Sequence, residues 1–304
     1  LIPTVCGENA VLRLLSSAST IRGFQELGFP QTRIKEFERL IEEPHGMVLV
    51  TGPTGSGKTT TLYTALKKLN TSDVNIMTIE DPVEIRMPMV RQVQVNASIG
   101  MTFASALRSI LRQDPDVVFV GEIRDDETAR ISLQAALTGH LVLSSLHTND
   151  AAGSIPRLRD LSCPPFAINA ALLCVIAQRL VKRVCQHCAA PAPLQPLIAA
   201  RFGIDPNEPG HVRGAGCARC GGAGTRGRIG IYEMLSVGPN VRAAIDRGAS
   251  AAEIAAVAVA DGMQPMALDG LAKARLGLTT VDEVARVATV VECEAHAVPE
   301  RAAA

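Results

Sequence analysis

The fold of this chain is constrained most strongly by residues 52–59, which read GPTGSGKT. The spacing G-x-x-x-x-G-K-[ST] follows an apolar run, residues 47–50, that has the character of a strand, and residues 60–69 have the character of a helix. In this context the glycines let successive backbone N–H groups turn around phosphate oxygens, and the helix presents its positive N-terminal end to them. A glycine-rich turn that only connects two elements fits this context poorly. The segment therefore predicts a nucleoside triphosphate site.

Within this loop, two side chains have predicted roles of their own. We expect Lys58 to reach the β- and γ-phosphates and Thr59 to hold Mg²⁺. ATP and Mg²⁺ are accordingly the expected cofactors. The other residues predicted to contact the nucleotide are Gly52, Pro53, Thr54, Gly55, Ser56, Gly57 and Thr60.

Length and charge limit the remaining possibilities. A chain of 304 residues is expected to hold about two domains. Its 30 basic and 30 acidic residues balance, so no overall positive field favours nucleic acid, and no nucleic-acid partner is expected. The longest apolar stretch, residues 166–177, is too short to span a bilayer, and the first residues lack a secretory signal pattern. We expect a cytoplasmic protein without direct membrane insertion and, because the chain starts at Leu1 within what resembles a domain, a piece of a longer protein.

The order of the elements predicts an α/β fold with a mostly parallel sheet. Apolar spacing indicates a strand over residues 6–15 and a helix over residues 32–43, which Pro44 ends. Residues 189–216 are rich in proline, residues 250–287 form small alanine-rich helices, and the chain past residue 287 is expected to fray. Between residues 47 and 145, strands alternate with helices. The predicted strands are residues 47–51, 74–79, 117–121 and 141–145, and the predicted helices are residues 59–69, 103–113 and 126–138.

Carboxylates after two predicted strands are candidates for the hydrolytic chemistry. Glu122 ends a buried β-branched strand, where ATPases of this type place the carboxylate that orients Mg²⁺ or its water. A second acidic cluster, residues 80–84, follows the strand at residues 74–79, at the carboxyl edge where open parallel sheets bind ligands. Glu84 is the first choice for activating the attacking water and Glu80 is the reserve. A capped turn accounts for Asp81-Pro82 equally well.

Four cysteines form two CxxC pairs, Cys185 with Cys188 and Cys217 with Cys220. Four thiolates suit tetrahedral Zn²⁺, and a site without an open position is structural. Two disulfides or empty reduced thiols are the alternatives, and His187 is a reserve ligand. Arginines near the pairs also fit a nucleic-acid finger, but no aromatic residues interleave with them. The remaining cysteines, for which small buried or inert surface thiols are expected, are Cys6, Cys163, Cys174 and Cys293.

Further motifs resemble those of one ATPase family. They are MTIEDPVE at residues 77–84, LRQDPD at 111–116 with VGEIRD at 120–125, and TGHLVLS at 138–144 with LHTN at 146–149. They resemble the Asp box, Walker B and His box of the GspE/PilB-type secretion ATPases, hexameric motors of type II secretion and type IV pilus assembly. The likeness covers about residues 1–287. It implies a RecA-like P-loop core, a tetracysteine zinc insert and a helical C-terminal subdomain.

The resemblance also implies roles and boundaries. His140 and His147, which flank the strand at residues 141–145, are expected near the γ-phosphate, and Arg13 is expected to reach the phosphates when an N-terminal domain closes. The family has further N-terminal domains, including a second arginine ahead of Leu1, that this sequence does not contain. The implied domains are a remnant of a PAS-like domain and linker helix (1–44), the ATPase core (45–182), the zinc module (183–235), a helical subdomain (236–290) and a disordered tail (291–304).

The resemblance implies a ring, expected to be a hexamer, that acts on inner-membrane platform and cytoplasmic docking proteins. Retraction ATPases of type IV pili generally lack the tetracysteine insert, so its presence indicates secretion or pilus extension. Residues 100–103 favour secretion. Two other classes stay open: a motor that translocates nucleic acid, which the neutral charge disfavours, and a zinc docking module with a mainly structural nucleotide site. The complete set Lys58, Thr59, Glu84 and Glu122 argues for turnover.

Overall fold

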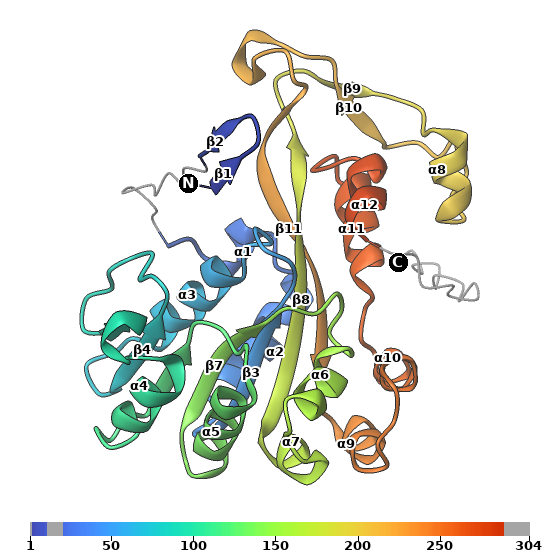
Figure 1. The fold of residues 1–304 in the computed structure, drawn as a ribbon. Coiled ribbons are helices and arrows are strands. Elements are labelled where there is room, and N and C mark those ends of the chain that lie inside the picture. The colour runs from blue at the N-terminus through green and yellow to red at the C-terminus, as the bar shows by residue number, and fades with distance from the viewer. Residues whose placement is uncertain (1, 11–20, 289–304) are drawn as a thin grey trace.

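A seven-stranded sheet forms the centre of the molecule. The computed structural model describes residues 2–10 and 21–288. Every neighbouring pair in the sheet is parallel except the edge pair β11–β8, and the spatial order is β11-β8-β3-β7-β6-β4-β5 (Figure 1). The α/β class with a mostly parallel sheet is thereby confirmed. The seven strands are β3 (Gly46–Thr51), β4 (Ile76–Glu80), β5 (Arg91–Gln94), β6 (Val117–Val120), β7 (Leu141–Leu146), β8 (Leu172–Val184) and β11 (Thr225–Ser236).

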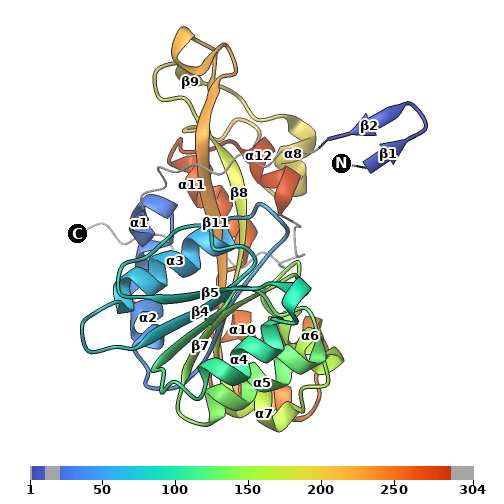
Figure 2. The ribbon, with the colours of Figure 1, turned by 60° about the vertical axis from the view of Figure 1, so that its left-hand side comes forward.

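Helices cover both faces of this sheet, as Figure 2 shows. One face packs against α1 (Phe24–Leu27), α2 (Gln31–Ile41) and α3 (Lys58–Leu69) around Phe37 and Tyr63. The other face packs against a longer series of helices around residues such as Leu107 and Leu133. That series comprises α4 (Phe103–Ile110), α5 (Asp126–Leu137), α6 (Ser154–Asp160), α7 (Pro165–Ala171), α9 (Pro239–Asp246) and α10 (Ala251–Ala260).

The pattern of alternating strands and helices between residues 47 and 145 is confirmed. Each predicted element is present, with ends that differ by a few residues, and the helix predicted for residues 32–43 is α2. Every residue of β3, β6 and β7 is buried and most are β-branched or aliphatic, as expected for parallel strands covered on both faces. Since these strands all run the same way, their carboxyl ends meet at one edge of the sheet.

Strands β8 and β11 form a long antiparallel ribbon that extends past this edge. The last residue that β8 pairs with β3 is Ala177, opposite Thr51, and beyond it β8 pairs only with β11. At about 3.3 Å per residue, the ribbon continues for roughly 23 Å to its tip. The tip carries the cysteine pairs together with β9 (Ala189–Pro191), β10 (Val212–Gly214), the short α8 (Pro196–Arg201) and the turn η2 (Ala218–Cys220).

This ribbon bears on the predicted division of the chain. Residues on both sides of the cysteine module belong to the one central sheet, because β11 pairs with β8 from Thr225 to Ser236. The boundaries predicted at residues 182 and 235 stay a proposal, and the sheet crosses them. Residues 289–304 lie outside the described residues, as does the second half of the strand predicted for residues 6–15. Its described part is β2 (Gly7–Asn9), which pairs with β1 (Ile2–Thr4) in a hairpin.

Two further helices close the fold against the ribbon. Helix α11 (Met266–Arg275) lies along β11, which is the edge strand of the sheet, and α12 (Val281–Val287) packs beside it. The buried Asp269 of α11 accepts a hydrogen bond from the Tyr232 N–H (2.8 Å), and Lys273 donates to the Gly230 carbonyl (2.8 Å). These side chains thus satisfy backbone groups that an edge strand leaves unpaired. Among the described residues, no helix is both long enough and apolar enough to cross a bilayer.

Candidate nucleotide site and metal centre

The phosphate-binding loop lies between β3 and α3, at the carboxyl edge of the sheet. Gly52 leaves β3 with φ +146° and Gly57 precedes α3 with φ +90°, conformations that side chains with a Cβ rarely adopt. A Cβ on Gly52 would also lie 2.5 Å from the Gln178 carbonyl oxygen. The local sequence therefore permits a tight loop that leads directly into the N-terminus of a twelve-residue helix, where phosphate groups are favoured.

Strand β8 holds this loop through Gln178, a residue that the sequence interpretation missed. The Gln178 amide nitrogen donates to the Ser56 carbonyl (2.7 Å), and its oxygen accepts from the Thr61 hydroxyl (2.8 Å). Gln178 is buried, so both bonds are shielded from water. Its side chain therefore fixes the loop against the first turn of α3. It lies in a nearly continuous apolar run, and its position beside Ser56 depends on the register between β8 and β3.

Lys58 lies over the loop. Its ammonium donates to the carbonyls of Gly52 (2.7 Å) and Pro53 (3.2 Å). Burial lowers the pKa of Lys58, the nearby charge of Arg179 lowers it further, and Glu122 opposes both. Arg179, a second residue that was missed, donates to the Asn149 carbonyl (2.8 Å). Arg179 therefore adds a cation near Lys58 that the sequence analysis did not predict.

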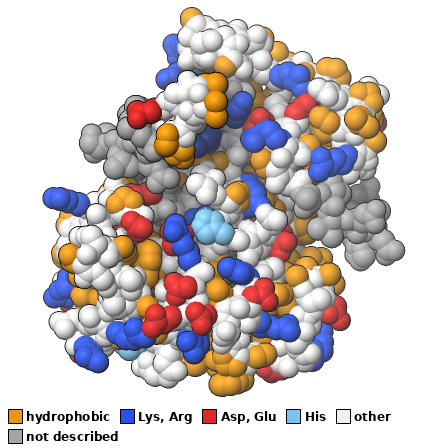
Figure 3. All heavy atoms as spheres, viewed as in Figure 1, with side chains coloured by type: hydrophobic (Ala, Val, Ile, Leu, Met, Phe, Trp, Pro, Cys, Tyr) orange, Lys and Arg blue, Asp and Glu red, His pale blue; other side chains and the backbone are white. Residues whose placement is uncertain are grey.

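Glu122 follows β6 and bridges Arg124 and His147. One carboxylate oxygen lies 2.6 Å from Arg124 and the other lies 3.2 Å from Nε2 of His147. The side chain of Glu122 is 15% exposed, and that of His147 is 46% exposed. Glu122 also acts electrostatically on Lys58, so the predicted residues Lys58, Glu122 and His147 share one edge of the sheet. The view in Figure 3 shows a histidine and basic side chains near the middle of one face, with acidic side chains beside them.

The two candidate bases after β4 have different surroundings. Glu80 is buried and accepts hydrogen bonds from Tyr63, from Thr78 (2.7 Å) and from Gln92 (3.1 Å). Burial raises the pKa of Tyr63, and its bond to Glu80 raises it further. Glu84 is exposed, and its carboxylate has no polar partner among the described residues. Of the two, only Glu84 has oxygens free to meet a water molecule.

The loop that carries Glu84 is held on both sides. The Ile85 N–H donates to the Tyr63 hydroxyl (3.3 Å), and the Met87 N–H donates to the Gln92 side chain (2.8 Å). Gln92 belongs to β5, a strand missed in the sequence, and Tyr63 belongs to α3, which begins at the phosphate loop. These contacts position the loop at residues 81–87 relative to α3.

The expectation that His140 lies near the γ-phosphate is wrong for the site of the same chain. His140 directly precedes β7, and His147 directly follows it. A strand of six residues spans about 20 Å, so its two ends lie at opposite edges of the sheet. His140 instead binds the Ala135 carbonyl through Nδ1 (3.0 Å), and its own carbonyl accepts from Gly46 at the start of β3. Arg13 lies outside the described residues.

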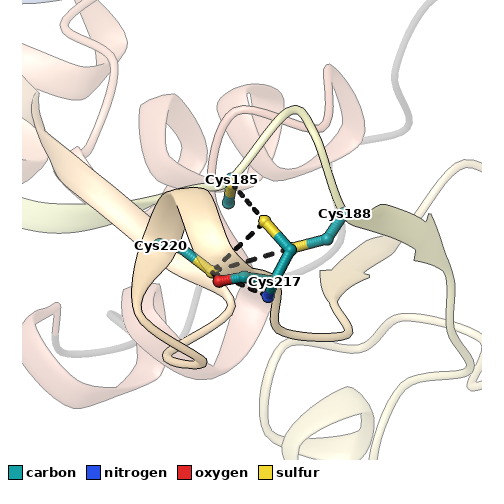
Figure 4. A group of neighbouring side chains, drawn as sticks. All are labelled: Cys185, Cys188, Cys217 and Cys220. Atoms are coloured by element: carbon teal, nitrogen blue, oxygen red, sulfur yellow. Dashed lines mark hydrogen bonds between the residues drawn. The ribbon is translucent and has the colours of Figure 1, made fainter.

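The four predicted cysteines converge at the tip of the ribbon, as Figure 4 shows. All four sulfurs lie within 4.8 Å of one another, and the distances Cys185–Cys217, Cys188–Cys220 and Cys217–Cys220 are 3.9, 3.9 and 3.8 Å. Sulfurs placed tetrahedrally about 2.3 Å from Zn²⁺ lie about 3.8 Å apart, whereas a disulfide requires about 2.05 Å. The arrangement fits a four-thiolate metal site and does not fit two disulfides.

Backbone geometry favours the thiolate form of Cys220 in this cluster. The N–H groups of Cys217 (3.2 Å) and Gly224 (3.3 Å) point at the Cys220 sulfur, and the Cys217 N–H contributes most to lowering the pKa of that thiol to about 6. His187, the reserve ligand, is not among the clustered ligand atoms and lies 2.8 Å from Arg219. Cys163 and Cys174 are buried, as the sequence suggested.

A phosphate loop at the carboxyl edge of a mostly parallel sheet, with Glu122 and His147 beside it, defines a P-loop nucleotide-binding protein. Within that class, the chain belongs to the family described as type II/IV secretion system protein, whose model matches residues 1–286.

Known relatives include proteins of two machines. The chain is 50% identical over 286 residues to the type IV pilus assembly ATPase PilB of Thermus thermophilus, covering 93% of this chain and 32% of that protein. It is 50% identical over 287 residues to the type II secretion system protein E of Pectobacterium carotovorum, covering 94% and 57%. The chain therefore spans a third to just over half of these relatives.

Solved structures share the fold. The pilus retraction motor PilT with bound ADP superposes with a TM-score of 0.68 at 30% identity, over 90% of this chain and 68% of that one. The ATPase DotB of Legionella pneumophila, at 24% identity, has a TM-score of 0.64 over 88% and 65%.

Proposed function

We propose that this chain is the ATP-hydrolysing part of a motor that powers type II secretion or type IV pilus assembly. The observation that carries the proposal is the convergence of Lys58, Glu122 and His147 beside the phosphate loop, in a chain that belongs to the secretion family. The names of the relatives at 50% identity include an ATPase of pilus assembly and a secretion protein. Phosphoryl transfer needs positioning and stabilisation of negative charge, and this edge of the sheet supplies cationic and acidic groups for both.

The residues divide this work by their surroundings. The loop N–H groups and Lys58 hold the phosphates, and Thr59 with Glu122 would hold Mg²⁺, which neutralises phosphate charge when bound. Glu84 orients and deprotonates the attacking water, since its carboxylate is free. His147 contacts Glu122 and so lies at the same edge of the sheet. Glu80 has a structural role under the site, because hydrogen bonds from Tyr63, Thr78 and Gln92 occupy its carboxylate oxygens.

Which machine the chain serves is decided by neither relative, since PilB and the secretion protein E match it equally well. We propose a hexameric ring that docks on an inner-membrane platform in either case, with ATP-driven domain movement as its work. The four cysteines hold a structural Zn²⁺ at the ribbon tip. The sulfur separations support this assignment.

Two substitutions test the proposed chemistry. Lys58→Ala should abolish binding of fluorescent ATP and turnover, because the phosphates lose their main cation. Glu84→Gln should keep binding while lowering kcat at least about a hundredfold, which is within the usual contribution of a general base. Lys35→Ala and Glu43→Gln, at exposed positions of α2 and the turn after it, are matched controls. Normal turnover by Glu84→Gln would remove Glu84 from its role, and ATP binding by Lys58→Ala would contradict the assigned loop.

A further inference from the structure

The segment after β7, residues 147–151, is attached to three strands in succession. The Thr148 N–H donates to the Thr51 hydroxyl at the end of β3 (2.8 Å). The Asn149 carbonyl accepts from Arg179 of β8 (2.8 Å), and the Ala151 N–H donates to Glu233 of β11 (2.9 Å). The segment that carries His147 is therefore fixed by side chains from the strands that border the nucleotide edge.

Glu233 differs from Thr51 and Arg179 because it also binds a second element, helix α11. Its other carboxylate oxygen accepts from the Met266 N–H (3.3 Å), at the first residue of α11. Helix N-termini leave such N–H groups without a partner inside the helix, and they favour negative charge. One carboxylate thus satisfies an orphan donor of α11 and a donor of the nucleotide-site segment.

The surroundings of Glu233 make this shared contact strong. Glu233 is 8% exposed, and the two residues that donate to it, Ala151 and Met266, are buried as well. Burial raises the pKa of Glu233, and the two backbone N–H groups and Arg179 counteract burial while Asp150 adds to it. A buried group left without its partner costs more than the same group in water. A displacement of α11 therefore forces Glu233 either to follow the helix or to leave Met266 unpaired.

Helix α11 is itself attached to β11 by a second, independent contact. Asp269 accepts from Tyr232 (2.8 Å) and binds Lys273 (2.5 Å), and neither residue contacts the segment at 147–151 among the described hydrogen bonds. Asp269 is as buried as Glu233. It offers a carboxylate that holds the same helix without touching the nucleotide edge.

We propose that Glu233 is a positioning residue of the nucleotide site that couples the start of α11 to the segment carrying His147. The coupling runs through one carboxylate. A change in the position of the first residue of α11 therefore alters the order of residues 147–151, and nucleotide-dependent ordering of that segment changes the position of the start of α11. The proposal deepens the proposed function and rests on it only for its kinetic consequence.

The sharpest test deletes one hydrogen-bond donor of α11. Met266→Pro removes the N–H that Glu233 accepts, while proline is well tolerated at the first position of a helix. The preceding Pro265 has φ −56° and ψ 146°, which is the conformation required before proline. Met266→Ala loses a similar part of the side chain and keeps the N–H, so it is the matched control.

Hydrogen exchange followed by mass spectrometry measures the coupling with and without ADP and Mg²⁺. We expect residues 147–153 to exchange about tenfold faster in Met266→Pro than in Met266→Ala, and faster still in Glu233→Gln. Asp269→Asn should loosen the contact between α11 and Tyr232, while Glu233 still holds the first residue of the helix, so residues 147–153 should stay close to the parent protein. Equal exchange in the two Met266 variants, or equal loss of protection in Asp269→Asn and Glu233→Gln, would overturn the proposal. Retained thermal unfolding transitions show that each variant is folded.

Kinetics separate positioning from general loosening. Glu233→Gln should lower kcat about tenfold with KM for ATP changed less than about twofold, since the contact orders the segment that carries His147 and leaves the phosphate loop intact. An unchanged kcat in an active protein would contradict the positioning role. Should the parent chain fail to hydrolyse ATP, the proposed function is in question, while hydrogen exchange still decides the coupling.

Discussion

Glu36 on α2 illustrates how single residues join the helices to the edge of the sheet. Its carboxylate accepts from Ser236 (2.6 Å), the last residue of β11, and pairs with Arg33 (2.6 Å). Burial alone would raise the pKa of Glu36, but the bonds from Ser236 and Arg33 outweigh it and bring the pKa below its ordinary value of 4.5. The charged form is therefore favoured in the folded state.

This shift predicts a pH-dependent contribution to stability. Because the pKa of Glu36 is lower when folded, its contribution is present above pH 4.5 and is lost as the pH falls through the folded value. We expect Glu36→Gln to lower the free energy of unfolding by about 1 kcal/mol at pH 7, a modest figure because the side chain is partly exposed. The difference from the parent should shrink below about pH 4.5 in urea titrations. A difference independent of pH would contradict this assignment, and Glu43→Gln is the control.

At the residue scale, the sequence predicted contacts that depend on near neighbours. Lys58 and the paired cysteines have roles fixed by local spacing, and the structure brings the four sulfurs together. Gln178, Arg179 and Glu233 were missed because their partners lie in loops and helices far away in the sequence, so only the register of β8 and β11 places them. His140 was misplaced because a histidine on each side of a strand was treated as if both ends met one edge.

At the scale of elements, the cysteine module lies at the end of the ribbon and packs against α11 and α12 through a small hydrophobic cluster. We expect the purified protein to contain about one Zn²⁺ per chain by elemental analysis, and Cys217→Ser to lose it, since four-thiolate sites hold Zn²⁺ through all four ligands. The loss should expose residues 185–224 to protease while β3, β6 and β7 stay protected. Cys6→Ser, at an exposed position, should keep the metal. Stoichiometric zinc in Cys217→Ser would contradict the four-thiolate site.

The elements that the sequence failed to reveal share a physical cause. Strand β5 consists of RQVQ, whose partly or fully exposed residues lack the apolar pattern of a strand, and it exists through pairing with β4. The first four residues of β11 are a partly buried threonine and exposed arginine and glycine residues, and the whole cysteine module lies between β11 and its partner β8 in the sequence. Such strands are defined by distant partners, whereas β3, β6 and β7 are defined by their own buried runs.

At the scale of the whole molecule, the nucleotide edge, the ribbon and α11 form one connected structure. The phosphate loop is held by Gln178 of β8, the His147 segment is held by Glu233 of β11, and the same ribbon carries the cysteine module. A nucleotide bound at this edge therefore contacts elements that lead to both the tip of the ribbon and the helices along β11. This connectivity is what a motor needs in order to turn nucleotide binding into domain movement.

The measurement that tests the central claim most directly is steady-state ATP hydrolysis with Mg²⁺ over a wide range of protein concentrations, beside Lys58→Ala. An oligomeric motor predicts a specific rate that rises with concentration and vanishes in the variant, because assembly then completes the site. The opposite result would be an assembled protein that binds ATP and does not hydrolyse it at any concentration. That result would contradict the account and favour a nucleotide site with a structural role.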